Sequence, residues 1–229
     1  AFMQSNHLLC ISKCFCMNSP QQSLEDLQHI KKMMERSSRF ISLSGLSGIA
    51  AGICALAGAW LAGQKINCWV KGDCQLSNLI YSGGRQLMNE LFWIATLTFV
   101  AAFALAFLFT FLRSKKTGTP MWGGSTLRLL WNTAVPLIAG AIFLFRMLQM
   151  GQFDLIAPGC LIFYGLALIN GSKYTLGEIK YLGYGNLLLG IINLWYVGYG
   201  LHFWAMGFGV LHIVYGIVMW NKYERKVKS

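Results

Sequence analysis

Asn186, Asn193 and His212 are the polar side chains best placed for chemistry, because each lies inside a long apolar segment near the C-terminus. Steps of three and four residues place both asparagines on one helical face and His212 on one face of the next helix. The other positions on these faces are mostly small: Gly183, Gly190, Val197 and Gly200 on the first, and Ala205, Gly209 and Gly216 on the second. Small residues let two backbones approach closely, and Asn or His among them can hydrogen-bond across the seam.

His212 decides between two interpretations of this cluster. It is the only titratable basic group well inside a predicted span, roughly 15 Å from the outer end of its helix at about 1.5 Å per residue. Ionisable residues within a membrane usually mark functional sites, which predicts a ligand cavity around Asn186, Asn193 and His212. The alternative is a neutral histidine that joins two helices, and the absence of carboxylates from the spans favours it.

A second candidate group lies near the outer ends of the predicted spans. Arg146, Asp154 and His202 form the expected rim of a cavity that opens outward. The sequence contains no glycine-rich phosphate loop, HExxH pattern or G-x-S-x-G pattern. Only His202 and His212 fall within the spans, too few for a four-histidine iron centre. We therefore expect no catalytic residues and no cofactor, and an enzyme is the third-ranked class.

The seven cysteines are scattered along the chain. Cys68 and Cys74 share one loop, with five residues between them. They form a disulfide if that loop faces an oxidising compartment, and two free thiols otherwise. Cysteines 10, 14 and 16 lie near His7 but match no zinc-ligand spacing, so no metal site is expected.

Composition identifies the elements that must position these groups. The chain has 229 residues, of which 55% are hydrophobic and 12% charged, with a mean hydropathy of +0.51. Soluble domains carry about twice this charged fraction. Several windows of about 20 apolar residues lack any charge, and backbone hydrogen bonding makes such windows helical in a membrane. We therefore predict an all-α, polytopic membrane bundle with six spans, at about 40–63, 91–112, 129–145, 155–170, 181–198 and 202–220. Pro136 predicts a kink near Asn132 in the third span.

The distribution of positive charge predicts the orientation of the bundle. With both termini in the cytoplasm, fifteen of the 19 Lys and Arg residues lie in inside segments, including the basic tail at 222–229. Lys65, Lys71, Arg85 and Arg146 are the four on the outside. This asymmetry follows the positive-inside rule and predicts a multi-pass protein of the cell's inner (plasma) membrane. The net charge of +11 is spread between the spans, so its expected partner is the lipid bilayer and not nucleic acid.

Residues 1–38 form the predicted cytoplasmic N-terminal segment. Ser23 and Asp26 resemble a capping box at the start of an amphipathic helix over about 23–36, with Leu27 and Ile30 on its apolar face. Two interpretations remain open. The helix lies at the membrane interface, or it docks a protein partner.

Three segments, RSSRFISLSGLSGI (36–49), LIFYGLALINGSKYTLGEI (161–179) and FWAMGFGVLHIVYG (203–216), carry a resemblance. They are similar to a group of small, uncharacterised bacterial integral membrane proteins with six helices. The resemblance covers most of the chain from about Met17 onward and implies a loose link to signalling, with no activity or catalytic residues to carry over. Our leading hypothesis is a non-enzymatic membrane subunit that acts through protein partners in sensing or regulation. The alternative is a small transporter or ligand-binding membrane protein that uses the cavity around Asn186, Asn193 and His212.

Overall fold

The computed structural model describes residues 45–71, 83–117 and 124–224. The predicted amphipathic helix at 23–36, and with it the docking hypothesis for Leu27 and Ile30, lies outside the described residues. Cys74 and most of the basic tail lie outside them too.

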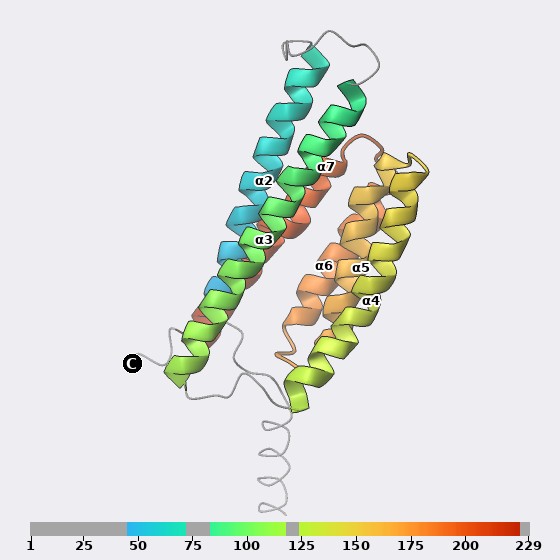
Figure 1. The fold of residues 1–229 in the computed structure, drawn as a ribbon. Coiled ribbons are helices and arrows are strands. Elements are labelled where there is room, and N and C mark those ends of the chain that lie inside the picture. The colour runs from blue at the N-terminus through green and yellow to red at the C-terminus, as the bar shows by residue number, and fades with distance from the viewer. Residues whose placement is uncertain (1–44, 72–82, 118–123, 225–229) are drawn as a thin grey trace, which may run out of the picture. The chain divides into compact units, whose positions relative to one another are not determined.

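Every regular element in the described ranges is helical (Figure 1). The helices are α2 (Gly45–Lys71), α3 (Gly83–Thr117), α4 (Gly124–Gln149), the short 3-10 turn η1 (Phe153–Leu155), α5 (Ile156–Gly171) and α6 (Ile179–Asn193). A final helix, called the C-terminal helix below, runs over residues 200–224. It comprises α7 (Gly200–Trp204), the π-helical turn η2 (Ala205–Val210), α8 (Leu211–Met219) and the π-helical turn η3 (Trp220–Glu224). The predicted all-α fold is confirmed for this part of the chain.

Five helices of the described chain are long and apolar enough to cross a membrane. They are Gly45–Val70, Leu87–Lys116, Thr126–Gln149, Phe153–Gly171 and Gly200–Tyr223. The remaining predicted span, 181–198, corresponds to α6, which has only 15 residues. A membrane span usually needs about 20 residues, so α6 is shorter than expected. Gly198, which has a positive φ, lies in the turns that follow α6, so the helix ends before residue 198 and the predicted end of this span is wrong.

Two close helix contacts organise the bundle. A Cβ atom on Gly165 of α5 would lie 2.8 Å from both the carbonyl oxygen of Gly183 and the backbone nitrogen of Leu187 on α6. A Cβ atom on Gly216 of α8 would lie 2.6 Å from the carbonyl oxygen of Gly45 on α2. Backbone therefore packs directly on backbone at both places, as small residues permit. The glycine faces of α6 and the C-terminal helix pack on two different helices, α5 and α2, and do not form one shared seam.

The proline in α4 is accommodated by a neighbouring helix. Pro136 lacks the N–H group that would normally bond to the carbonyl oxygen of Asn132, four residues earlier. The Nδ2 group of Asn170, on α5, donates to that carbonyl oxygen at 2.7 Å. This cross-helix bond satisfies an acceptor that no water could reach in a lipid environment.

α3 and α4 have the fewest neighbours among the long helices. α3 packs mainly against α2, and α4 packs mainly against α5, while the C-terminal helix contacts α2, α5 and α6 (Figure 1). None of the most apolar 18-residue window of α3 is buried inside the protein. α3 and α4 do not pack extensively on each other, and side chains from both helices line one apolar cavity.

Candidate functional site

The π-helical turn η2 sets the position of His212. The N–H group of Leu211 bonds to the carbonyl oxygen of Met206, five residues earlier, instead of to Gly207, four residues earlier. Nδ1 of His212 lies 2.9 Å from the carbonyl oxygen of Gly207. The carbonyl oxygen of Gly207 therefore does not accept from Leu211 in this wide turn, and it accepts from Nδ1 of His212 instead. Such π turns inside helices are frequent at functional sites.

The other ring nitrogen of His212 meets a tyrosine from α5. Nε2 of His212 lies 2.7 Å from the hydroxyl oxygen of Tyr164. Because the Gly207 carbonyl can only accept, Nδ1 carries a proton. The neutral ring then accepts at Nε2, and the Tyr164 hydroxyl donates. Both ring nitrogens are thus engaged, one within the C-terminal helix and one across to α5.

An aromatic row extends from this pair along the C-terminal helix. Trp204, Phe208 and His212 are spaced four residues apart and occupy one face. Neighbouring ring centroids in the row are 5.1 Å and 5.9 Å apart, and the Tyr164 ring lies 4.9 Å from that of Phe208. These distances are typical of favourable aromatic pairs.

This aromatic row borders an apolar cavity of about 510 Å³, which lies between the helix pair α2 and α3 and the helix pair α4 and α5. Its walls come from α2, α3, α4 and α5, with His212, Tyr164 and Phe208 on one side. Most of the remaining lining is alanine, leucine and phenylalanine, including Ala102 of α3 and Leu137 of α4. A cavity with apolar walls and a few polar groups is the usual form of a small-molecule site.

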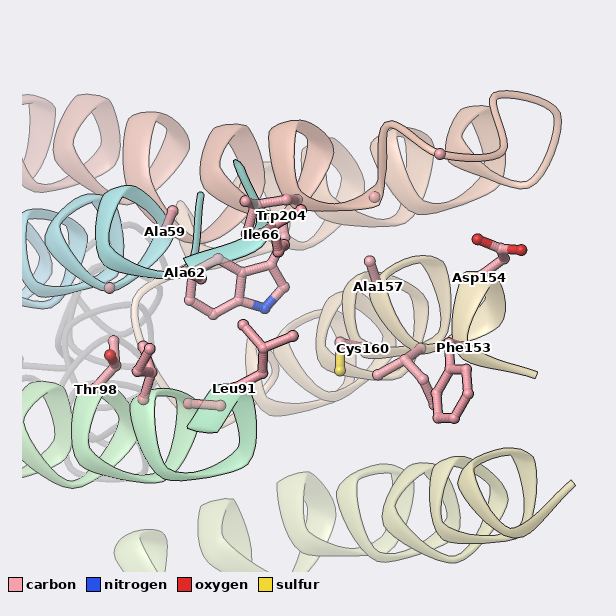
Figure 2. Close-up of a pocket in the computed structure, with 17 residues that line it drawn as sticks. Ala59, Ala62, Ile66, Leu91, Thr98, Phe153, Asp154, Ala157, Cys160 and Trp204 are labelled. Carbon is pink, nitrogen blue, oxygen red and sulfur yellow. The ribbon is translucent and has the colours of Figure 1, made fainter. Parts of the chain in front are cut away.

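A second cavity of about 410 Å³ adjoins the first (Figure 2). The two share four lining residues: Ala95, Thr98, Cys160 and Trp204. Figure 2 shows Asp154 and Phe153 at one end of this cavity and Trp204 and Thr98 further along it. The two cavities adjoin at these shared residues, and together we call them the lateral cavity.

No protein-family model, curated protein or solved structure matches this chain. A function must therefore be inferred from the lateral cavity and the groups around it.

The two predicted asparagines do not line the lateral cavity. Asn186 is fully buried, and its Nδ2 group donates to the carbonyl oxygen of Leu182 in its own helix at 2.9 Å. The Oδ1 atom of Asn186 and the Nδ2 atom of Asn193 have no hydrogen-bond partner within the described part of the chain. A Cβ atom on Gly207 would lie 2.7 Å from Asn186 Oδ1, so this asparagine faces the π-helical turn. The structure therefore separates His212, which borders the cavity, from Asn186 and Asn193, which lie in helix contacts.

The predicted outer rim is also divided. Asp154 lines the lateral cavity, whereas Arg146 and His202 do not. The Nη1 group of Arg146 donates to Gln149 at 3.2 Å. His202 is exposed, and its ring centroid lies 5.9 Å from that of Tyr199. Cys68 lies in the last turn of α2 and not in a loop, because the helix continues to Lys71. The sequence leaves a disulfide with Cys74 and two free thiols open, and the pairing stays a prediction because Cys74 is outside the described residues. Within the described ranges, no three His, Cys, Asp or Glu residues gather closely enough to hold a metal ion.

Sequence reasoning missed Tyr164, Trp204 and Cys160 as cavity residues. The four-residue spacing of Trp204, Phe208 and His212 was a readable signal of a shared face. Nothing in the sequence pairs Tyr164 with His212, because they are 48 residues apart and on different helices.

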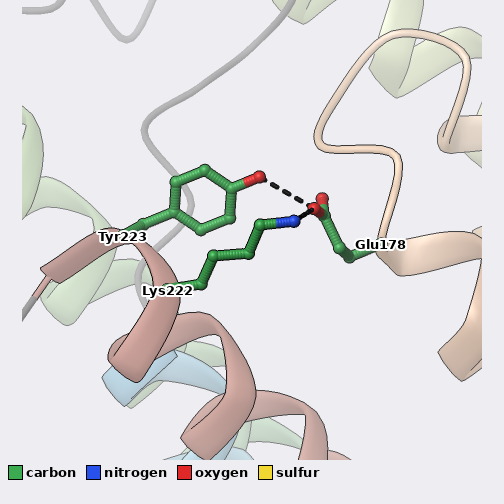
Figure 3. Close-up of polar contacts among 3 residues, drawn as sticks. All are labelled: Glu178, Lys222 and Tyr223. Atoms are coloured by element: carbon green, nitrogen blue, oxygen red, sulfur yellow. Dashed lines mark hydrogen bonds and ion pairs between the residues drawn. The ribbon is translucent and has the colours of Figure 1, made fainter.

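A further polar cluster joins the start of α6 to the end of the C-terminal helix (Figure 3). The Glu178 carboxylate accepts from Lys222, with which it forms an ion pair, and from the Tyr223 hydroxyl at 2.8 Å. Burial by itself raises the pKa of the Glu178 carboxyl, but these hydrogen bonds outweigh it and hold the pKa below its ordinary value. The cluster therefore fixes one end of α6 beside the end of the last helix.

Proposed function

We propose that this chain is a multi-pass membrane protein that binds a lipid-soluble ligand in the lateral cavity. The observation that carries the proposal is a large apolar cavity with walls from α2, α3, α4, α5 and the C-terminal helix, which the hydrogen-bonded Tyr164–His212 pair borders. Its apolar walls suit a hydrocarbon chain. The Tyr164 hydroxyl donates its hydrogen bond to His212, and its oxygen can still accept a hydrogen bond from a ligand. The partner-subunit hypothesis depends on residues outside the described ranges and stays a prediction.

The proposed topology has six passes with both termini in the cytoplasm. Glu178 opens α6 and contacts Lys222 and Tyr223 near the end of the last helix, so α6 runs opposite to that helix. A Cβ atom on Gly45, at the start of α2, would lie 2.5 Å from the backbone nitrogen of Trp220, which supports placing both ends of the bundle on one side. Arg113, Lys115, Lys116, Lys173, Lys180 and Lys222 then share the positive, cytoplasmic side. Labelling of single cysteines introduced at Lys173 and Met150 with a membrane-impermeant reagent tests this topology, because the two are expected to react from opposite sides.

Cys160 provides an internal reporter for ligand binding. It is a free, half-buried thiol that lines both parts of the lateral cavity, whereas Cys54 is a free, half-buried thiol that lines neither. The experiment follows the alkylation of both thiols by N-ethylmaleimide in phosphatidylcholine nanodiscs, with mass spectrometry of the modified peptides. We expect 1-dodecanol, a neutral single-chain probe, to slow alkylation of Cys160 and leave Cys54 unchanged.

A matched pair of variants tests whether the cavity is responsible. Ala102→Phe fills the cavity from α3, and Ala101→Phe places the same ring on an exposed position that does not line it. Protection of Cys160 by dodecanol should disappear in A102F and persist in A101F. Equal protection in the two variants, or equal slowing of Cys54 and Cys160, would overturn the proposed function.

A further inference from the structure

Asp154 gives the lateral cavity a chemically distinct end. Among the described residues that line the cavity, it is the only Asp, Glu, Lys or Arg. The ion pairs resolved within the described ranges join Lys65 to Glu90 and Lys222 to Glu178, and neither involves Asp154. An unpaired carboxylate at the mouth of an apolar cavity attracts positive charge and repels negative charge.

Two aromatic side chains line the same part of the cavity. Phe153 precedes Asp154 in the chain, and Trp204 lies further along the cavity, where its two parts meet (Figure 2). Carboxylates and aromatic rings both attract alkylammonium ions. Asp154 and Phe153 provide such groups at this end of the cavity, and Trp204 lies where the chain of a ligand would pass. In the part of the lining that the structure describes, no lysine or arginine is available to a phosphate or carboxylate headgroup.

The length of the cavity fits one lipid-like chain. Asp154 and Tyr164 are ten residues apart, which corresponds to roughly 15 Å along the helix at about 1.5 Å per residue. Half of a hydrocarbon core of about 30 Å is the same length. A chain held from Asp154 to Tyr164 would therefore extend from one membrane interface to the middle of the bilayer.

We propose that the ligand of the lateral cavity is a single-chain amphiphile with a cationic, ammonium-type headgroup. The headgroup lies at Asp154, and the chain passes Cys160 toward Tyr164 and His212. This inference rests on the proposed function and adds the charge of the ligand and its direction in the cavity.

The experiment compares three probes that share a twelve-carbon chain: dodecyltrimethylammonium, 1-dodecanol and dodecyl sulfonate. Each is titrated against alkylation of Cys160 in full-length protein in phosphatidylcholine nanodiscs at low ionic strength. We expect the cation to protect Cys160 at a concentration about fivefold lower than dodecanol, as one exposed charge interaction would give, and the sulfonate to protect least. Asp154→Asn should abolish the preference for the cation without weakening dodecanol, and Asp154→Glu should retain the preference.

Glu90→Gln is the matched control. It removes one negative charge from the start of α3, where Glu90 pairs with Lys65 and does not line the cavity. If E90Q and D154N reduce the cation preference equally, general surface charge explains it and the inference is wrong. Asp154 lies just before α5, where a negative charge also stabilises the helix through its dipole. If that is its only role, D154N keeps the wild-type preference for the cation, and the inference is wrong. Equal protection by dodecanol and the cation in wild-type protein would overturn the inference and leave the proposed function standing. Failure of both probes to protect Cys160 would overturn the proposed function itself.

Discussion

The glycine contacts and the lateral cavity differ in how closely their helices pack. At Gly165 and Gly183, and again at Gly45 and Gly216, two backbones meet with no room for a methyl group. Between α3 and α4, mostly alanine, leucine and phenylalanine side chains border open volume, and the two helices pack little on each other. The first kind of contact holds the helices in fixed positions. The second leaves space that a ligand or lipid chain can enter.

The polar groups follow the same division. Asn170 and Asn186 bond to backbone carbonyl groups, so their role is explained by helix packing. Tyr164 and His212 connect two helices at the border of the open volume, where the same bond also faces the cavity. We therefore expect substitutions in the glycine contacts to act mainly on stability, and substitutions at the cavity border to act on stability weakly and on binding strongly.

The largest effect is expected from Gly165→Ala. The added methyl group would lie 2.8 Å from backbone atoms of α6, which cannot move aside as a flexible side chain could. Overpacking of this kind costs about 1–3 kcal/mol. Thermal unfolding in detergent measures the change. Gly63→Ala is the control, because its methyl group would lie 3.6 Å from a leucine side chain and alanine favours the helix. If G165A and G63A unfold at the same temperature, the contact between α5 and α6 has room for a methyl group and is looser than a 2.8 Å distance implies.

A smaller effect is expected from Asn170→Ala, which removes the donor to the Asn132 carbonyl oxygen. Leaving a fully buried acceptor unsatisfied costs about 1–3 kcal/mol, and we expect a value near the lower end because this bond is only part-buried. Pro136→Ala restores a backbone N–H group to the same acceptor. The double variant should therefore be more stable than N170A alone. Additive effects of the two substitutions in a double-mutant cycle would show that Asn170 does not compensate for the proline.

Tyr164→Phe removes the hydroxyl that bonds to Nε2 of His212. Bonds between membrane helices contribute about 0.6 kcal/mol on average, so we expect a loss of that order. Tyr184→Phe is the control, since Tyr184 is 52% exposed on α6 and lines neither part of the cavity. Both variants are measured by thermal unfolding and by dodecanol protection of Cys160. Loss of stability in Y164F with unchanged protection would mean that Tyr164 acts in helix packing and not in binding.

The smallest effect is expected from Glu178→Gln. The Glu178 side chain is 22% exposed and Lys222 is 53% exposed, so solvent screens the pair, and we expect a fall in Tm of roughly 1–2 °C at pH 7. The folded pKa of Glu178 lies below its ordinary value of 4.5, so the contribution is complete above about pH 4.5 and is lost as pH falls through the lower folded value. Unfolding of wild type and E178Q across pH 3–7 should converge at the acid end. A difference that persists there would show that the charge of Glu178 is not what stabilises the contact.

A comparison of A102F with G165A tests whether the lateral cavity and the glycine contacts differ in packing. If A102F destabilises the protein as much as G165A, the lateral cavity is as closely packed as the glycine contacts, and the division between the two regions is wrong. Thermal unfolding of A102F, which the binding experiment already requires, provides this measurement.

The sequence predicted the helices well where long apolar windows determine them. The spans at 91–112 and 129–145 fall inside α3 and α4, because lipid requires any such window to satisfy its own backbone hydrogen bonds. The end of α6 was placed too late, since the apolar residues after Asn193 continue the composition of a span but not its helix. The small-residue faces of α6 and the C-terminal helix were identified correctly as packing faces, yet their partners were not.

The sequence by itself determined that the chain is helical and apolar, and which residues share a face, because helical periodicity and hydropathy are local properties. Only the tertiary structure decided which faces meet. It placed Tyr164 beside His212, Asn170 beside the carbonyl group freed by Pro136, and Asp154 at the end of a cavity that neither Asn186 nor Asn193 reaches. These pairings depend on contacts between residues dozens of positions apart, and apolar helices of similar composition leave many such arrangements open until backbone contacts at a few glycines select one.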